Sequence, residues 1–383
     1  MKILMVAIPN HHFFQWVNQL EQAGHEVHWF DITDGAGFSN KIKWVKQCNG
    51  WKLRWDFPFR STLKNKLPKL YSFIQLFNER KLEPVFQNYL HKIKPDIVHV
   101  FDLELTGIPL LSAFKNNKSY SLIYSSWGSD MFYFRERGIS PLLVNTFLNK
   151  VNVIVSDCHR DIKLAKKNGL KDNSQSFVLP GNGGISLLKD LILPTNQRNI
   201  ILLKGYQFDV GEAIQIIKAI ELLPVSLIKN YEIIVYSSDN EIIEYVQNSE
   251  YYKYISIKLF ARNIHVPNSD ILEIMGKSVL HIANNVSDGM PNSLLEAMGM
   301  GAFPIQSNPG NVTEEVITHG KNGFLIFDSF DIEVISKLIL NALQNESLRQ
   351  TAQEYNTRFI LENYDRNQLK NKIVAVYNSV KNN

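Results

Sequence analysis

Two acidic residues eight positions apart, Asp288 and Glu296, lie on either side of a turn that opens a helical run. The stretch around them reads SDGMPNSLLEAMGMGAFPI, with Gly289 and Pro291 in the turn. Such a turn favours the start of a helix, where free N–H groups and the positive end of the dipole attract anions. A carboxylate one turn later can accept two hydrogen bonds from a sugar diol. The spacing therefore predicts a site for an anion that carries a sugar.

A nucleotide diphosphate joined to a sugar fits this chemistry. Glu296 would hold the ribose diol, and Asp288 would reach a hydroxyl of the transferred sugar. The predicted contacts to the diphosphate come from the turn and the first helical residues: Gly289, Met290, Pro291, Asn292 and Ser293. A structural interpretation stays open, in which the polar residues cap the helix and Glu296 merely offsets its dipole.

Several motifs with other chemistry are missing. The sequence has no G-x-G-x-x-G, no phosphate loop, no H-E-x-x-H and no G-x-S-x-G, so dehydrogenase, P-loop NTPase, zinc protease and α/β-hydrolase readings lose their main support. The two cysteines, Cys48 and Cys158, form neither a disulfide framework nor a metal-binding spacing, which fits the reducing cytoplasm. We therefore expect no metal and no cofactor, only the donor nucleotide sugar.

Two domains are expected to position these residues, because 383 residues exceed what one core usually supports. Buried strands are predicted at 2–8, 25–32, 96–102, 121–127, 151–157 and 176–181, and again at 199–205, 231–237, 255–260, 278–284, 302–307 and 323–327. Helices are predicted at 12–23, 158–168, 211–223, 241–248, 269–276, 292–300, 312–318, 330–344 and 352–383. This alternation is typical of two doubly wound α/β domains.

The domain boundary is placed in a polar, Pro-containing linker near 187–198. Residues 1–188 would form the first domain, 189–360 the second, and 361–383 a helix that packs back toward the first. Open α/β sheets bind ligands at the carboxyl ends of their strands, so a site is expected in a cleft between the two domains. No apolar run reaches the ~20 residues that span a bilayer, and the first ten residues favour a buried strand over a signal peptide.

At the acidic pair the chain resembles the retaining glycosyltransferases of family 4, which have the GT-B fold. Their hallmark places two glutamates eight positions apart in a segment like S-E-G-x-x-x-x-x-L-E-A-M, followed by G-G-x-x-E-x-V-x-x-G-x-x-G. The matching stretches here are SDGMPNSLLEAMGMGAFPI and NPGNVTEEVITHGKNGFLI, with weaker similarity in GHEVHWFDI, KPDIVHVFD, SSWGSD and KGYQFDVGEAI. The resemblance implies transfer of a sugar, with retained anomeric configuration and without metal, to an acceptor held by the first domain.

The chain departs from the family pattern at three places. The first acid is Asp288 instead of Glu, and Trp127 stands where relatives often have a histidine beside the reacting sugar. The family's Gly-Arg is Gly205-Tyr206, two residues that we still expect to contact the donor. Its following lysine falls on Val210 or Gly211, so the usual cations for the leaving diphosphate are missing. Lys204 and Arg262 are the candidates to replace them, because leaving-group charge needs preorganised positive groups.

Candidates on the acceptor side follow the first strand and lie in SSWGSD. They are Asn10, His11, His12, Trp127 and Asp130. Histidines at a helix start are often structural, so His11 and His12 keep both interpretations. Front-face retaining transfer uses the leaving phosphate to accept the acceptor proton, so no protein base is assigned.

Residues 41–69 hold nine Lys or Arg and a single acid, Asp56, a local charge of +8 in a chain whose total is +4. Trp44, Trp51 and Trp55 lie in the same window. Basic residues among tryptophans favour an anionic membrane surface, while a solvated loop over core aromatics stays the alternative; nucleic acid is not expected.

The sequence thus predicts a glycosyltransferase that glycosylates a glycan or lipid-linked acceptor in surface polysaccharide or glycolipid assembly, in the cytoplasm or on the inner membrane face. Two alternatives stay open. One is a nucleotide-sugar 2-epimerase of the same fold, and the other a protein that binds nucleotide sugars without turnover.

Overall fold

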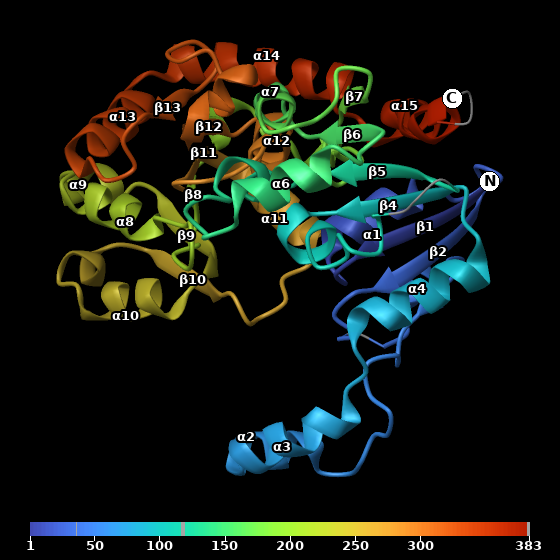
Figure 1. Cartoon of the computed structure of the whole chain (residues 1–383). Coiled ribbons are helices and arrows are strands. Elements are labelled where there is room, and N and C mark those ends of the chain that lie inside the picture. Colours follow the sequence, from blue (N-terminus) through green and yellow to red (C-terminus); the bar gives the residue numbers. More distant parts are fainter. Residues whose placement is uncertain (36, 116–118, 381–383) are drawn as a thin grey trace. The chain divides into compact units, whose positions relative to one another are not determined.

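The computed structural model describes residues 1–35, 37–115 and 119–380, which form two compact units (Figure 1). Unit 1 holds Met1–Ser156, Ile162–Gly183 and the segment from Lys370 onward, and unit 2 holds Asp157–Asp161 and Gly184–Leu369. No helix among the described residues is both long and apolar enough to cross a membrane.

Unit 1 is built on a parallel sheet of seven strands in the order β3-β2-β1-β4-β5-β6-β7. Their apolar side chains explain their burial: every residue of β1 after Lys2 is buried. The strands are β1 (Lys2–Ala7), β2 (Glu26–Asp31), β3 (Lys46–Cys48), β4 (Ile97–Phe101), β5 (Ser121–Ser125), β6 (Val153–Ser156) and β7 (Gln175–Val178).

The helices of unit 1 connect these strands, as parallel pairing requires. They are α1 (His11–Asn18), α2 (Arg60–Lys66), α3 (Pro68–Asn78), α4 (Leu82–Ile93), α5 (Ser129–Phe132), α6 (Pro141–Leu148), α7 (His159–Lys167), which begins in unit 2, and α15 (Arg366–Ser379), most of which belongs to unit 1. Helix α15 contributes Tyr377, whose hydroxyl accepts a hydrogen bond from Trp16 Nε1 (2.8 Å) and contacts His99 Nδ1 (2.8 Å). The last helix therefore completes the buried centre of unit 1.

Unit 2 has a parallel sheet of six strands in the order β10-β9-β8-β11-β12-β13. The strands are β8 (Ile200–Lys204), β9 (Glu232–Ser238), β10 (Ile257–Ala261), β11 (Ser278–Ala283), β12 (Phe303–Ser307) and β13 (Phe324–Ile326). The helices are α8 (Ala213–Glu221), α9 (Val225–Ile228), α10 (Asn240–Asn248), α11 (Asn268–Lys277), α12 (Asn292–Gly299), α13 (Ile332–Gln344) and α14 (Glu346–Asn363). Strand order changes direction between β8 and β11, where such sheets bind ligands.

The predicted fold class of two doubly wound parallel-sheet domains is confirmed, and each predicted strand has its counterpart within a few residues. Strand β3 was not predicted, because three residues with the sequence KQC carry no apolar pattern. The helix expected at 12–23 ends at Asn18.

Two predicted helices are wrong as continuous elements. The segment 312–318 contains only the 3-10 turn η7 (Thr313–Glu315), because the Asn322 side chain accepts a hydrogen bond from Thr318 N (2.7 Å) and donates one to Val316 O (3.0 Å) in place of helical bonds. The segment 352–383 is not one helix, because Ile185 bonds to Tyr364 O (2.8 Å) and accepts from Arg366 N (3.0 Å) between α14 and α15.

Candidate functional site

Polar groups gather in unit 2 where β8 and β11 end. Lys204 is the last residue of β8, and the turn after β11 leads through Asp288 into α12. Helix α12 begins with Pro291 as its N-cap residue (φ −66°, ψ 121°), and no side chain among the described residues caps it. The first N–H groups of α12 therefore have no N-cap side chain to bond to, whereas the Met290 N–H just before them bonds to Asp157. Binding of an anion at this helix start stays a prediction.

The two acids of the motif lie in this region and are mostly surrounded by protein. Asp288 accepts a hydrogen bond from Asn285 Nδ2 (2.8 Å), and Glu296 accepts one from Asn268 Nδ2 (3.3 Å). Burial raises the pKa of Asp288 above its usual range, and it raises the pKa of Glu296 to about 7. Both side chains keep some contact with solvent. Glu296 is thus short of hydrogen bonds, whereas Asp288 also accepts one from the Gly289 N–H group. Sugar hydroxyls can fill the positions that remain.

Of the two candidate cations, Lys204 and Arg262, Lys204 is the one that acts electrostatically on both acids. The positive charge of Lys204 opposes the rise in pKa of both Asp288 and Glu296, which places it within electrostatic reach of each acid. It forms no ion pair within 4 Å among the residues that the structure describes. Lys204 therefore supplies positive charge at the same place as the two acids.

Arg262 is engaged elsewhere. Its guanidinium pairs with Asp239 (Nη1–Oδ1 3.2 Å) and lies over the Tyr206 ring at 4.5 Å from the centroid. Burial works against ionisation of Asp239, but hydrogen bonds from the Gln207 and Phe208 N–H groups and from Arg262 hold its pKa below the usual value. Arg262 also borders a cavity of about 620 Å³. The residues that line this cavity are Gln207, Phe208, Asp209, Ser238, Asp239, Asn240, Glu241, Arg262 and Asn263.

Three glycines of the region allow close packing. A Cβ on Gly205 would lie 2.7 Å from Ser238 Cα, and one on Gly211 would lie 2.2 Å from Tyr206 O. At Gly289 the close neighbour is the Asp157 carboxylate, 2.4 Å from an added Cβ. The sequence predicted that Gly289 makes room for a diphosphate; in the structure it makes room for Asp157.

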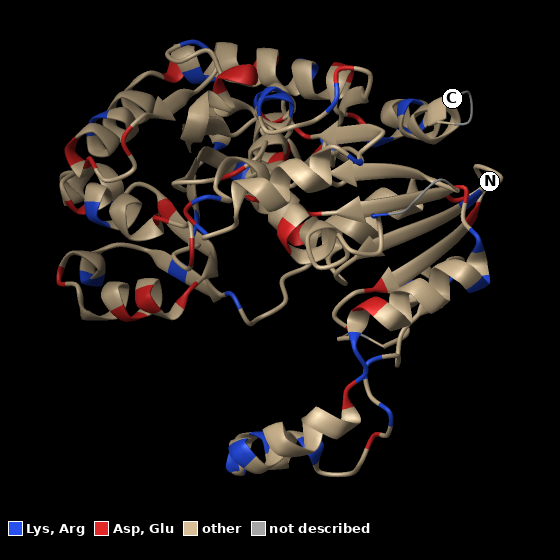
Figure 2. Cartoon of the chain, in the orientation of Figure 1, with Lys and Arg blue, Asp and Glu red and all other residues tan. Residues whose placement is uncertain are grey.

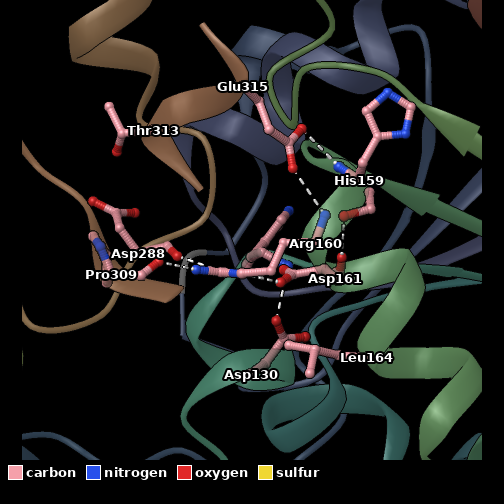
Figure 3. Close-up of polar contacts among 12 residues, drawn as sticks. Asp130, His159, Arg160, Asp161, Leu164, Asp288, Pro309, Thr313 and Glu315 are labelled. Carbon is pink, nitrogen blue, oxygen red and sulfur yellow. Dashed lines mark hydrogen bonds and ion pairs between the residues drawn. The ribbon is translucent and has the colours of Figure 1, made fainter. Parts of the chain in front are cut away.

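Arg160 was not predicted and contacts the loop that carries Asp288. Its guanidinium donates to the carbonyl oxygens of Asp288 (Nη2, 2.7 Å) and Pro309 (Nη1, 2.7 Å), and its Nε pairs with Asp161 (2.8 Å) (Figure 3). Glu315 accepts hydrogen bonds from the backbone N–H of His159 (2.8 Å) and Arg160 (2.9 Å) at the start of α7. Arg160 is 128 residues from Asp288, and no sequence pattern indicated this network, although its acid, Glu315, is the second glutamate of the stretch NPGNVTEEV.

One group of side chains among the described residues has spacing that could hold an ion: Asp157, Cys158 and Asp161. Burial raises the pKa of the Cys158 thiol and, together with the charge of Asp161, raises the pKa of Asp157 well above its usual value. Burial thus disfavours the thiolate and the charged carboxylate that a metal would need, and Arg160 already pairs with Asp161. The donor set therefore fits a buried hydrogen-bonded cluster better than a metal site.

Asp130, one of the residues predicted to face the acceptor, lies in unit 1 and is 1% exposed. Its carboxylate accepts hydrogen bonds from Leu103 N (2.8 Å), Trp127 N (2.9 Å) and the Tyr124 hydroxyl (2.7 Å). Burial raises the pKa of Asp130, and these three bonds oppose the rise. With its lone pairs used by the fold, Asp130 shapes the loop after β5 and has little capacity left for an acceptor.

The other acceptor candidates lie around the start of α1. Asn10 Oδ1 accepts from Phe13 N (2.8 Å), so Asn10 is the N-cap of α1. His11 and His12 are exposed at the first positions of the helix, and the His12 ring lies 6.5 Å from the Trp127 ring. The Trp127 Nε1–H group is buried and has no partner among the described residues. The structure therefore brings His12 and Trp127 together, near the first strand.

Comparison with known families identifies both halves of the chain. Residues 192–359 match the family model described as glycosyl transferases group 1, and residues 2–158 match the model described as glycosyl transferase 4-like. No curated protein sequence matches the chain significantly.

Solved structures show the same fold over the whole chain. Sucrose-phosphate synthase from Thermosynechococcus elongatus has a TM-score of 0.72 at 13% identity, and the match covers 100% of this chain and 99% of that one. HepE from Anabaena in complex with UDP-glucose has a TM-score of 0.66 at 12% identity, with 99% and 100% covered. TarM has a TM-score of 0.69 at 12% identity, with 98% of each chain covered. These matches establish the two-domain GT-B fold.

Proposed function

Because residues 192–359 match the model of group 1 glycosyl transferases and residues 2–158 match the glycosyl transferase 4-like model, we propose that the chain transfers a sugar from a nucleotide-diphospho-sugar with retention of configuration. The acceptor is a glycan or a lipid-linked molecule in the assembly of a surface polysaccharide or glycolipid. One observation carries the proposal: a lysine, two largely buried acids with raised pKa values and an uncapped helix start converge at the switch point of unit 2.

The charges assign a role to each group. The donor diphosphate lies at the start of α12 beside Lys204, which stabilises the negative charge that grows on the leaving group. Glu296, one turn into α12, accepts hydrogen bonds from the ribose diol, and Asp288 accepts from a hydroxyl of the transferred sugar. Because hydrogen bonds from the ribose diol favour the carboxylate form, they lower the pKa of Glu296 from about 7 when the donor binds.

The cavity of about 620 Å³ beside Tyr206 takes the nucleoside. Arg262 and Phe208 on its wall offer a cationic plane and an aromatic ring, both suited to a flat base. This placement gives Arg262 a binding role and leaves the leaving-group charge to Lys204.

No protein base is needed in this scheme. The leaving phosphate oxygen accepts the proton of the acceptor hydroxyl as the new glycosidic bond forms on the face that the diphosphate leaves. Trp127 and the histidines His11 and His12 form the acceptor side, where they shape the site and carry no proton. Lys204 meets the charge that a metal meets in other transferases, so we propose that the transfer is metal-independent.

The deciding experiment combines the chain with candidate donors and a membrane lipid extract. We expect release of nucleoside diphosphate only with extract, an unchanged rate with EDTA, and a product whose anomeric coupling in NMR equals that of the donor. Conversion of the donor to its epimer without acceptor would indicate the epimerase. Donor binding without release would indicate a binding protein. Inversion at the anomeric carbon would reject the retaining mechanism.

A further inference from the structure

The basic stretch 41–69 divides into two parts with different surroundings. In the first part, Trp51 is buried, stacks on Phe30 (centroids 5.2 Å apart) and donates to Asp31 O (2.7 Å). Trp44 donates to Asn18 Oδ1 (2.9 Å), and Lys46 pairs with Glu26 (2.5 Å). These two aromatics belong to the core and its edge, whereas Trp55, at the end of this part, is 48% exposed.

The second part is a helical hairpin formed by α2 and α3, which we call the α2–α3 hairpin (residues 57–78). Its base is closed by backbone hydrogen bonds from Arg54 N to Asn78 O (2.8 Å) and from Arg80 N to Lys52 O (2.7 Å). The Asn78 side chain adds two bonds to the backbone of Trp55, both 2.9 Å. The hairpin therefore has a defined attachment to unit 1.

Helix α3 has one face that is covered and includes polar side chains, and an opposite face that is exposed and mostly apolar. Tyr71, Ile74, Gln75 and Asn78 lie on one side of the helix by their 3.6-residue spacing and are covered or partly covered. The opposite side carries Leu70, Phe73, Leu76 and Phe77, which are exposed, Leu76 at 76% and Phe77 at 62%. Phe59 and Leu67 add to this exposed set. A soluble helix normally buries its apolar stripe, so this face lacks its covering.

Charge indicates what covers it. The hairpin holds Arg60, Lys64, Lys66 and Lys69 and no acid, a net charge of +4 (Figure 2). Lys69 shares the exposed side of α3 with Phe73 and Leu76 by helical spacing. A second copy of the same face would bring +4 against +4. Exposed aromatics beside lysines instead match a bilayer, whose acyl boundary takes the rings while its anionic headgroups face the lysines.

We infer that the α2–α3 hairpin docks the protein on an anionic lipid bilayer, with Phe73, Leu76 and Phe77 inserted at the headgroup boundary and Lys64, Lys66 and Lys69 against the headgroups. This surface is separate from the donor site in unit 2 and does not depend on the proposed transfer. A cavity of about 440 Å³ at the base of the hairpin, bordered by Lys52, Arg54 and Tyr71, lies within the same part of unit 1.

The test measures sedimentation of the full chain with vesicles of phosphatidylcholine, with and without phosphatidylglycerol. One variant replaces Phe73, Leu76 and Phe77 with Ser, and a second replaces Lys64, Lys66 and Lys69 with Gln. The matched control replaces Lys163, Lys166 and Lys167, which are exposed on α7, with Gln. Because the substituted side chains of the hairpin are exposed, the variants are expected to keep the melting temperature of the wild type.

We expect wild type to bind only vesicles with phosphatidylglycerol, and binding to weaken as salt rises. Each lysine at such a surface contributes roughly fivefold, so the hairpin lysine variant should lose roughly 100-fold in partitioning. The serine variant should lose at least roughly tenfold at low salt, and the control should stay within roughly threefold of wild type. Transfer to a short soluble acceptor should continue in all of them.

Three results would overturn the inference. The first is no binding by wild type at low salt. The second is an equal loss in the α7 control and the hairpin lysine variant, which would mean attraction by net charge alone. The third is a wild-type dimer in sedimentation equilibrium that the serine substitutions dissociate, without binding to vesicles, which would assign the face to a second copy. A loss of soluble transfer with intact docking would concern the proposed function alone.

Discussion

Polar residues gather at the carboxyl ends of central strands in both units, but the two units use them differently. In unit 1 the carboxylate of Asp130 accepts three hydrogen bonds from the fold, and Asn10 is spent on capping α1. In unit 2 Glu296 accepts a single long bond from Asn268, and Lys204 has no ion pair among the described residues. At the same position in similar sheets, the polar side chains of unit 1 thus have their hydrogen bonds made within the fold, whereas Glu296 and Lys204 of unit 2 have few partners.

The difference indicates where a charged ligand binds. A polar group whose bonds are already made gains little from a ligand, whereas an under-bonded, partly buried charge gains the bonds that it lacks. Under the proposed function, unit 2 therefore supplies the electrostatic contacts to the donor. Unit 1 provides aromatic surface, such as Trp127, with its buried Nε1–H group as a directed donor.

The largest expected effect comes from removing either acid of unit 2. We expect Asp288→Ala and Glu296→Ala each to lower turnover by on the order of 10² or more, because charged hydrogen bonds to the donor are lost. The measurement is kcat at saturating donor, with Glu333→Ala, an exposed acid in the first turn of α13, as the control. A near wild-type kcat in either variant would remove that acid from the site.

The second prediction separates the two cations of unit 2. Lys204→Met should lower kcat by roughly 10² and donor affinity much less, because leaving-group charge develops mainly in the transition state. Arg262→Met should instead weaken donor binding and leave kcat within roughly threefold. Steady-state kinetics with varied donor give both constants. The reverse pattern would assign the leaving group to Arg262, and an unchanged kcat in both variants would place the cation elsewhere.

A third prediction concerns the free energy of unfolding and its dependence on pH through the buried carboxyl group of Glu296. The pKa of Glu296 is about 7 in the folded chain and near 4.5 when exposed, so the folded state holds a proton that the unfolded state releases between these values. The proton stabilises the fold at low pH, and this stabilisation is lost as pH rises through 7. Glu296→Gln avoids the loss, so its stability advantage should grow by about 2 kcal/mol between pH 5 and pH 8. Urea unfolding at both pH values checks this, and parallel curves for the two proteins would contradict it.

The smallest effect is expected at Arg160, which acts on the site through the Asp288 carbonyl. Arg160→Lys keeps the charge but cannot donate to two carbonyls and a carboxylate at once, so kcat should fall by about tenfold while donor KM changes little. Arg358→Lys, on the exposed surface of α14, is the matched control. A loss that follows the melting temperature alone would show that Arg160 stabilises the fold without positioning Asp288.

The sequence predicted the sheets well because parallel strands buried on both faces are continuous apolar runs. It failed where the structure depends on partners distant in the chain. The Asn322 side chain replaces helical bonds after Val316, and Ile185 interrupts the last predicted helix at Asp365. Edge strand β3 carries too little apolar pattern to be recognised.

The sequence could predict which types of residue form the site, but not which of the two cations lies beside the acids. Spacing located the acids and the start of α12, since both belong to one local segment. The choice between Lys204 and Arg262 required the position of Asp239, which occupies Arg262. The contact of Arg160 with the Asp288 loop joins segments 128 residues apart, so no local sequence pattern predicts it.

The return of α15 to unit 1 sets an order of events during synthesis. His99 is buried, and burial lowers its pKa to about 3; its partner Ser125 is 26 residues away in the chain, whereas its other partner, Tyr377, is 278 residues away. Tyr377 is made only after all of unit 2, which at ribosomal rates of 5–20 residues per second is roughly 10–40 s after Gly183. During this interval the nascent first unit has a gap beside Trp16 and His99. Unit 2 can thus finish folding first, although its residues are translated second.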